Sequence, residues 1–138
     1  MLTAGQIGVI KEGGALFVDG EGIYSYGDNT TITNSGSIIV EDDDGIDSFG
    51  NNTTITNSGS ITAGDSGIDS YGNNTIITNS GSINTLDDAG IDLYGNNTIV
   101  NNSGSIVVID GDGIDSYGNN TIVNNSGSII VLDDAGID

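Results

Sequence analysis

The sequence predicts an all-β fold, a parallel β-helix in which each repeat forms one coil of about 23 residues with three short strands. Near-copies of residues 99–106, Ile-Val-Asn-Asn-Ser-Gly-Ser-Ile, recur along almost the whole chain, and the block Gly-Ile-Asp-Ser-Tyr-Gly-Asn-Asn-Thr precedes them in near-copies of its own. The glycines that begin successive units lie 22 or 23 residues apart: Gly22, Gly45, Gly67, Gly90, Gly113 and Gly136. A fixed period of this size is typical of solenoid proteins.

Composition favours the same fold class. Of the 138 residues, 23 are Gly and none is Pro, and Ile, Val, Thr, Ser and Asn dominate the rest. These residue types favour strands joined by many tight corners. No window carries apolar residues at helical spacing, so we expect no helix.

The chain divides into a divergent start and a regular array. Residues 1–21 are predicted to be a divergent N-terminal coil or cap, and residues 22–138 hold five repeats and the start of a sixth. Asp138 stands three residues into that sixth unit, so we expect either a piece of a longer array or a protomer that stacks end to end.

The divergent start carries two apolar segments. Residues 3–7 align with residues 34–38 of the first full unit. Residues 8–10 and 15–18 flank Glu12-Gly13-Gly14, a pattern that predicts a short β-hairpin.

Alternation assigns the inward positions of each coil, because successive side chains of a strand point to opposite faces. In the unit that begins at Gly45, the predicted inward residues are Ile46, Ser48, Thr53, Ile55, Asn57, Ile61 and Ala63. Gly-Asn-Asn, Asn-Ser-Gly and an Asp-rich segment then form three corners, which predicts a triangular cross-section.

Two columns of repeated residues have structural interpretations. The inward amides Asn34, Asn57, Asn79, Asn102 and Asn125 are predicted to form a ladder in which each donates to the next, as in stacked cross-β amides. A ligand-binding role is the alternative for this column. The column Gly27, Gly50, Gly72, Gly95 and Gly118 is predicted to supply corners with positive φ.

Charge and composition exclude several function classes. The chain has 20 Asp and Glu residues against one Lys, a formal net charge of −19. Nucleic acids and anionic membranes both require clustered Lys and Arg, so neither is an expected partner. There is no Cys or His, no recognisable signal peptide and no apolar span of membrane length, so we expect no membrane insertion by this segment.

The repeats resemble those in the passenger domains of bacterial autotransporters and related surface adhesins. The resemblance is carried by Gly-Ile-Asp-Ser-Tyr-Gly-Asn-Asn-Thr-Ile-Val-Asn-Asn-Ser-Gly-Ser-Ile and covers residues 22–138. It implies a right-handed parallel β-helix with an extracellular or bacterial cell-surface location. Passenger domains of this kind include adhesins, toxins and proteases.

Carboxylates are the only abundant catalytic residue type. The column Asp47, Asp69, Asp92, Asp115 and Asp138 could supply acid pairs for glycoside hydrolysis, but a ladder repeated in every coil offers no pair in two different environments. We therefore expect no catalytic residues and no enzyme.

The Asp-rich corner allows two interpretations. Acidic residues recur there in 42–44, 87–88, 110–112 and 133–134. A solvated acidic edge that keeps the rod soluble is the first interpretation, with no cofactor and no metal ligand. A calcium site is the alternative, because oxygen-only clusters suit Ca²⁺ and residues 110–115 resemble part of an Asp-x-Asp-Gly calcium loop.

Two outward columns are candidates for a contact face. One is aromatic: Tyr26, Phe49, Tyr71, Tyr94 and Tyr117. The other is β-branched and consists of Thr31, Thr54, Ile76, Ile99 and Ile122, of which the three Ile residues form the candidate apolar contact face. Stacked aromatic residues stabilise neighbouring strands without any ligand, whereas an exposed row could contact sugar rings or another rod.

These observations favour a structural or adhesive rod of a secreted or cell-surface protein. The expected partners are further copies of the chain, stacked head to tail into filaments, or a host-surface or glycan receptor. A carbohydrate-active or carbohydrate-binding β-helix is the alternative function.

Overall fold

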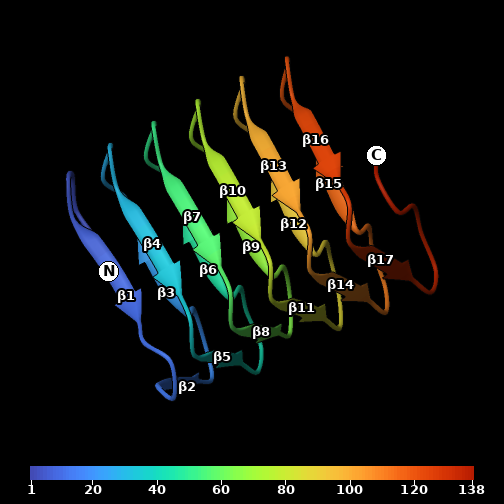
Figure 1. The fold of residues 1–138 in the computed structure, drawn as a ribbon, viewed down its shortest axis with the longest axis horizontal. Coiled ribbons are helices and arrows are strands. Elements are labelled where there is room, and N and C mark those ends of the chain that lie inside the picture. The colour runs from blue at the N-terminus through green and yellow to red at the C-terminus, as the bar shows by residue number, and fades with distance from the viewer.

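The computed structural model describes all residues from 1 to 138 and is a parallel β-helix, which confirms the predicted fold class. The coils stack along the long axis of the molecule, and the two termini lie at opposite ends of the rod (Figure 1). Every strand pairs in parallel with the equivalent strand of a neighbouring coil. No helix is present, and hence none that could span a membrane.

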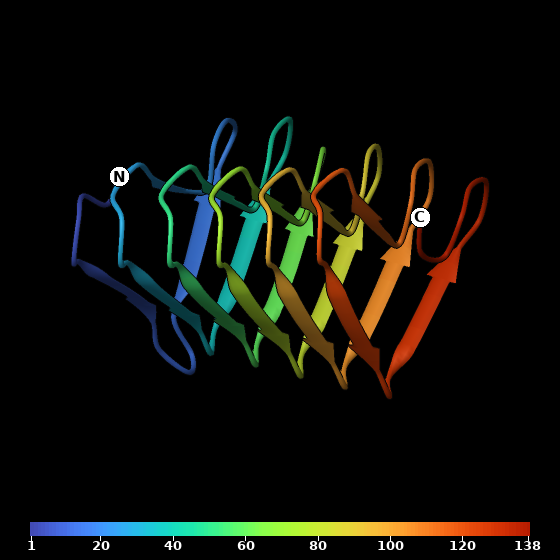
Figure 2. The same ribbon diagram turned by 90° about the horizontal axis from the view of Figure 1, so that it is seen from above.

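The strands form three sheets, which are visible as three rows of arrows in Figure 2. Each coil contributes one strand to each sheet, except that the last coil contributes only to the first two. The first sheet contains β1 (Ile7–Ile10), β4 (Thr31–Asn34), β7 (Thr54–Asn57), β10 (Ile76–Asn79), β13 (Ile99–Asn102) and β16 (Ile122–Asn125). The second contains β2 (Ala15–Val18), β5 (Ser37–Val40), β8 (Ser60–Ala63), β11 (Ser82–Thr85), β14 (Ser105–Val108) and β17 (Ser128–Val131). The third contains β3 (Ile23–Ser25), β6 (Ile46–Ser48), β9 (Ile68–Ser70), β12 (Ile91–Leu93) and β15 (Ile114–Ser116).

The hairpin predicted for the N-terminal segment is wrong. Strand β1 pairs with β4 and β2 pairs with β5, so the two strands lie in different sheets. The register places Ile7 beside Thr31, so the expected alignment of residues 3–7 with residues 34–38 is also wrong. Each strand instead lies beside its counterpart in the next coil, which lets Ile10 and Leu16 pack against the core.

The core is a column of branched aliphatic side chains along the axis of the rod. Fifteen buried residues form it, and Ile supplies most of them. The seven inward positions predicted for the coil at Gly45 are all buried, which confirms that part of the interpretation. Each buried Ile contributes about 1.5–3 kcal/mol relative to exposure, and this burial is achieved only against the neighbouring coils.

The asparagine column forms a continuous hydrogen-bonded ladder inside the rod. Each Nδ2 donates to the Oδ1 of the next Asn, at 2.8 Å in all four steps from Asn34 to Asn125. The first four side chains are at most 1 % exposed, whereas Asn125 is exposed. These bonds satisfy the buried amides in place, as buried polar groups require.

The corners depend on Asn for their backbone conformation, and the expectation that the Gly column supplies positive φ is wrong. Positive φ falls on the Asn two residues after the Gly of each corner, at 57–60° in Asn29, Asn52, Asn74, Asn97 and Asn120. The first of these corners is Gly27-Asp28-Asn29, and the others are Gly-Asn-Asn. Asn tolerates this region because its short side chain bonds locally. Gly72 is required for a different reason, since a Cβ there would overlap the carbonyl oxygen of Gly50 in the preceding coil.

Replacement of Asn102 by Leu should lower the free energy of unfolding by on the order of 1–3 kcal/mol, because the buried Nδ2 of Asn79 then loses its acceptor. Urea unfolding measures the change. The matched control is Asn101→Leu on the same strand, whose outward side chain bonds only the exposed Asn124. An equal effect of the two substitutions would contradict a stabilising ladder.

Candidate functional site

The outer face of the third sheet carries two adjacent side-chain columns. In the repeated Ile-Asp-Ser-Tyr segment, Ile and Ser point into the core, so Asp and the aromatic residue two positions later point outward. Parallel pairing in register stacks Asp47 on Asp69 and Asp69 on Asp92. An acidic column therefore runs beside the aromatic column.

The aromatic column is a continuous stack of rings. Between successive residues from Tyr26 to Tyr117, the ring centroids lie 5.3, 4.6, 4.7 and 5.0 Å apart, and the interplanar angles are 18° or less. The four Tyr side chains are 41–66 % exposed, and Phe49 is half-buried. The faces of the inner rings are thus covered by their neighbours, and their edges form a ribbon along the rod.

The apolar column lies on a different side of the rod. Ile76, Ile99 and Ile122 stack in register on β10, β13 and β16 of the first sheet. Ile76 and Ile122 are exposed and Ile99 is half-buried. The structure does not bring this column together with the aromatic one, so the two candidate contact faces are separate.

The outward Asp column is buried in the middle of the rod. Asp47, Asp69 and Asp92 are 7 %, 6 % and 3 % exposed, whereas Asp115 is half-buried and Asp138 is exposed. The Oδ1 atoms of the three buried residues have no hydrogen-bond partner. The expectation of equivalent environments in every coil is therefore wrong, because burial differs along the column.

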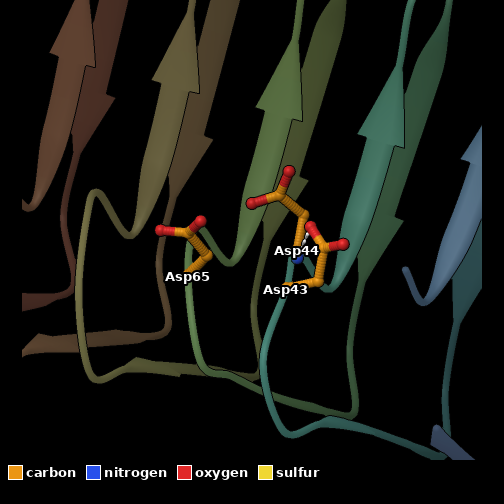
Figure 3. Close-up of side chains that lie close together, drawn as sticks. All are labelled: Asp43, Asp44 and Asp65. Carbon is orange, nitrogen blue, oxygen red and sulfur yellow. Dashed lines mark hydrogen bonds between the residues drawn. The ribbon is translucent and has the colours of Figure 1, made fainter. Parts of the chain in front are cut away.

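The acidic corner between the second and third sheets meets this column at Asp44. The Oδ1 of Asp44 accepts a hydrogen bond from the backbone N–H of Ser66 in the next coil at 2.9 Å. Figure 3 shows Asp43 and Asp44 on one coil and Asp65 on the next. These three residues each offer a carboxylate oxygen within 4.8 Å of the others, and Asp44, Asp47 and Asp69 form a second such group.

Most of the remaining corner carboxylates are exposed, as a solvated edge requires. Asp42, Asp87, Asp88, Asp110, Asp133 and Asp134 all belong to this set. Asp43, Asp44 and Asp112 are half-buried. The sequence pattern marks the corner as acidic, but it does not distinguish the exposed carboxylates from those that face the buried column.

Burial dominates the electrostatics of the site. Desolvation raises the pKa of Asp44 and of Asp47 to about 7, and nearby carboxylates act in the same direction. Desolvation likewise raises the pKa of Asp69 to about 8, although the Tyr71 hydroxyl partly opposes it, and raises the pKa of Asp92 to about 6. The only Lys or Arg side chain, Lys11, is exposed in the turn between β1 and β2 and far along the chain from these groups.

Two features of this candidate site were missed by sequence reasoning. Tyr24 stands where later coils have Asp, and its ring lies 4.4 Å from that of Tyr26, which widens the first end of the aromatic column. The convergence of Asp44 with Asp69 was also missed. The recurring Asp three residues before the column Asp is the signal that could have found it, since it appears again at Asp112.

The free energy of unfolding should increase as the pH falls from about 8 towards about 4, because the folded state binds protons on Asp69, Asp47 and Asp44 more tightly than the unfolded state does. Below the ordinary Asp pKa both states are protonated and the destabilisation disappears. Urea unfolding with a chelator, at several pH values above the isoelectric point of about 4.1, measures the slope.

Asp69→Asn should flatten this pH dependence and raise stability at the alkaline end, since the amide carries no charge to desolvate. The matched control is Asp87→Asn in the exposed part of the corner, which should leave the slope nearly unchanged. Stability that rises with pH in the unsubstituted protein would contradict the raised pKa values.

Comparison of the chain with protein-family models, with curated proteins and with solved structures finds no match.

Proposed function

We propose that this chain is a structural and adhesive rod of a secreted or cell-surface protein, without enzymatic activity, that works by presenting repeated side-chain columns. The observation that carries the proposal is the ribbon of stacked, half-exposed aromatic rings along one side of the rod. The likeness of the repeats to autotransporter passenger domains adds support for a location outside the cell.

The interior of the rod explains how such a ribbon can be held straight. The three inner rings, Phe49, Tyr71 and Tyr94, each follow directly after a strand that pairs in register with the strands of both neighbouring coils. The amide ladder on the first sheet adds side-chain bonds between the same coils. A contact surface built on paired strands loses little conformational freedom on binding, which favours affinity.

The form of the ribbon favours a protein surface over a sugar as the partner. A sugar ring packs against the face of an aromatic ring, and the faces of Phe49, Tyr71 and Tyr94 are covered by neighbouring rings. The hydroxyls of Tyr71 and Tyr94 lie close to Asp69 and Asp92. What remains for a partner is a row of apolar ring edges.

The burial of the carboxylates supports a role without catalysis. General acid-base chemistry requires a carboxylate within hydrogen-bond reach of the substrate. The unpartnered oxygens of Asp47, Asp69 and Asp92 are enclosed, so a polysaccharide on the surface does not reach them. A carbohydrate-active role would require a groove that exposes an acid pair.

Adhesion of beads coated with the protein, to cultured host cells and to a glycan array, tests the contact face. Tyr71→Ser with Tyr94→Ser should reduce adhesion on the order of tenfold, because hot-spot contacts of this kind are worth about 1.4 kcal/mol or more. Tyr71→Phe with Tyr94→Phe should retain adhesion, since the ring edges remain.

Ile76→Thr with Ile99→Thr on the other side of the rod is the matched surface control and should also retain adhesion. Circular dichroism checks that every variant is folded. Full adhesion by the Ser variant, or no adhesion by the unsubstituted protein, would contradict the proposed contact face. Turnover of an acidic polysaccharide would contradict the absence of catalysis.

End-to-end association is the structural part of the proposal. The terminal strands β1 and β16 each pair on one side only, and a hollow of about 500 Å³ at the first end is lined by apolar residues that include Leu2, Ile10, Leu16 and Ile23. A second copy placed on this end would continue the columns and cover the apolar lining.

Light scattering should detect dimers or filaments that increase with salt. The net charge of −19 opposes approach of two copies, and the Debye length falls from about 30 Å at 0.01 M to about 8 Å at 0.15 M salt. A monomer at every salt concentration in that range would remove end-to-end assembly from the proposed function and leave the lateral contact face unaffected.

A further inference from the structure

We propose that Asp44, Asp47 and Asp69 bind a calcium ion that bridges two adjacent coils of the rod. Asp44 comes from the acidic corner, Asp47 from β6 in the same coil and Asp69 from β9 in the next coil. One carboxylate oxygen from each residue lies within 4.8 Å of the other two.

The unpartnered oxygens supply an observation that points to a ligand. Asp47 and Asp69 are more than nine-tenths buried, and the Oδ1 of each has no hydrogen-bond partner in the protein. Most other polar side chains inside the rod have partners, as the Asn ladder and the Ser48 and Ser70 hydroxyls show, and the Thr85 hydroxyl is the one uncharged exception. A buried charged oxygen is normally paired or bound to a metal ion.

No Lys, Arg or His side chain is available as a counter-ion at this site. The chain has one Lys or Arg side chain and no His, and Lys11 is exposed in the turn between β1 and β2. Asp43 and Asp65 lie at the margin of the site and add negative charge, since with Asp44 they form the adjoining group within 4.8 Å. Five carboxylates thus converge without a cationic side chain, so their charge must be neutralised by protons or by a cation from solution.

The spacing of the oxygens suits calcium. Ca²⁺ binds oxygen ligands at about 2.3–2.6 Å, so two ligands on opposite sides of the ion lie about 4.6–5.2 Å apart. Three oxygens within 4.8 Å of one another fit inside such a shell. Calcium also accepts irregular geometry, and water at the half-buried Asp43 and Asp65 side can complete the shell of six to eight ligands.

The coils themselves provide an internal comparison. The position of Asp44 is occupied by Ser66 in the next coil and by Ala89 in the one after it. Asp92 has a buried, unpartnered Oδ1 like those of Asp47 and Asp69, but it belongs to no group of three carboxylates. Burial alone therefore does not create the site, and the corner Asp completes it.

The same arrangement recurs near the other end of the rod. Asp112 and Asp115 of one coil meet Asp138 of the next, again with oxygens within 4.8 Å. This second group is half-buried to exposed and has no enclosed, unpartnered oxygen. The proposal is confined to the group at Asp44.

Titration calorimetry of the protein with CaCl₂ at about pH 8, in constant NaCl, tests the site. We expect a dissociation constant on the order of 10⁻⁴–10⁻³ M, the range of extracellular calcium modules, and weaker binding of MgCl₂ because Mg²⁺ demands a stricter geometry. Asp47→Asn and Asp69→Asn should each weaken the binding about tenfold or more.

Asp92→Asn is the matched control, since it removes an equally buried carboxylate from the same column but outside the group. It should leave calcium affinity unchanged within about twofold. The addition of CaCl₂ should also raise the midpoint of thermal unfolding, at matched ionic strength, in the unsubstituted protein and in Asp92→Asn but not in Asp69→Asn.

Loss of a carboxylate is expected to leave the rod folded, because Asn keeps the shape of Asp without its charge, and circular dichroism checks this. Equal midpoints in CaCl₂ and NaCl would overturn the proposal. So would calcium binding that Asp92→Asn weakens as much as Asp69→Asn, since that result would mean diffuse attraction to the acidic column. Neither outcome bears on adhesion by the aromatic ribbon.

Discussion

The structure depends on hydrogen bonding of each coil to the next in parallel register. Each strand contacts its own counterpart one unit away, so equivalent residues lie on top of one another throughout the rod. A side chain in a repeated position must therefore be compatible with a copy of itself at strand spacing. Isolated coils lack this partner and bury little apolar surface.

Most of the repeated residues satisfy this requirement because their side chains can bond to, or stack on, identical side chains in the next coil. A primary amide has both donors and an acceptor, so Asn57 can receive from Asn34 and donate to Asn79. A hydroxyl group can also both donate and accept, and aromatic rings on successive coils can stack in parallel with an offset. Because the sequence repeats, these side chains form hydrogen bonds and ring contacts between successive coils.

The carboxylate is the exception, because an ionised Asp accepts hydrogen bonds and donates none. Stacking Asp47 on Asp69 therefore produces repulsion and leaves buried oxygens without partners. Either a proton or a bound cation can relieve this, and the two remedies differ in their dependence on pH and on calcium. The contribution of the acidic column to the stability of the rod therefore depends on pH and on calcium concentration. The amide ladder has no charge, so its contribution does not depend on them.

The sequence by itself determined the parallel β-helix, the period and the inward positions such as Ile55 and Asn57. Periodicity and strand alternation are properties of neighbouring residues, so they can be recognised without the fold. The partner of each N-terminal strand was decided only by the tertiary structure, because Ile10 and Leu16 reach the core beside the next coil and not in a hairpin. The placement of positive φ on Asn52, with Gly50 kept small by the carbonyl of Gly27, was likewise decided between coils. The meeting of Asp44 with Asp69 follows from a register that joins residues far apart in the sequence, and burial there depends on side chains from two coils at once.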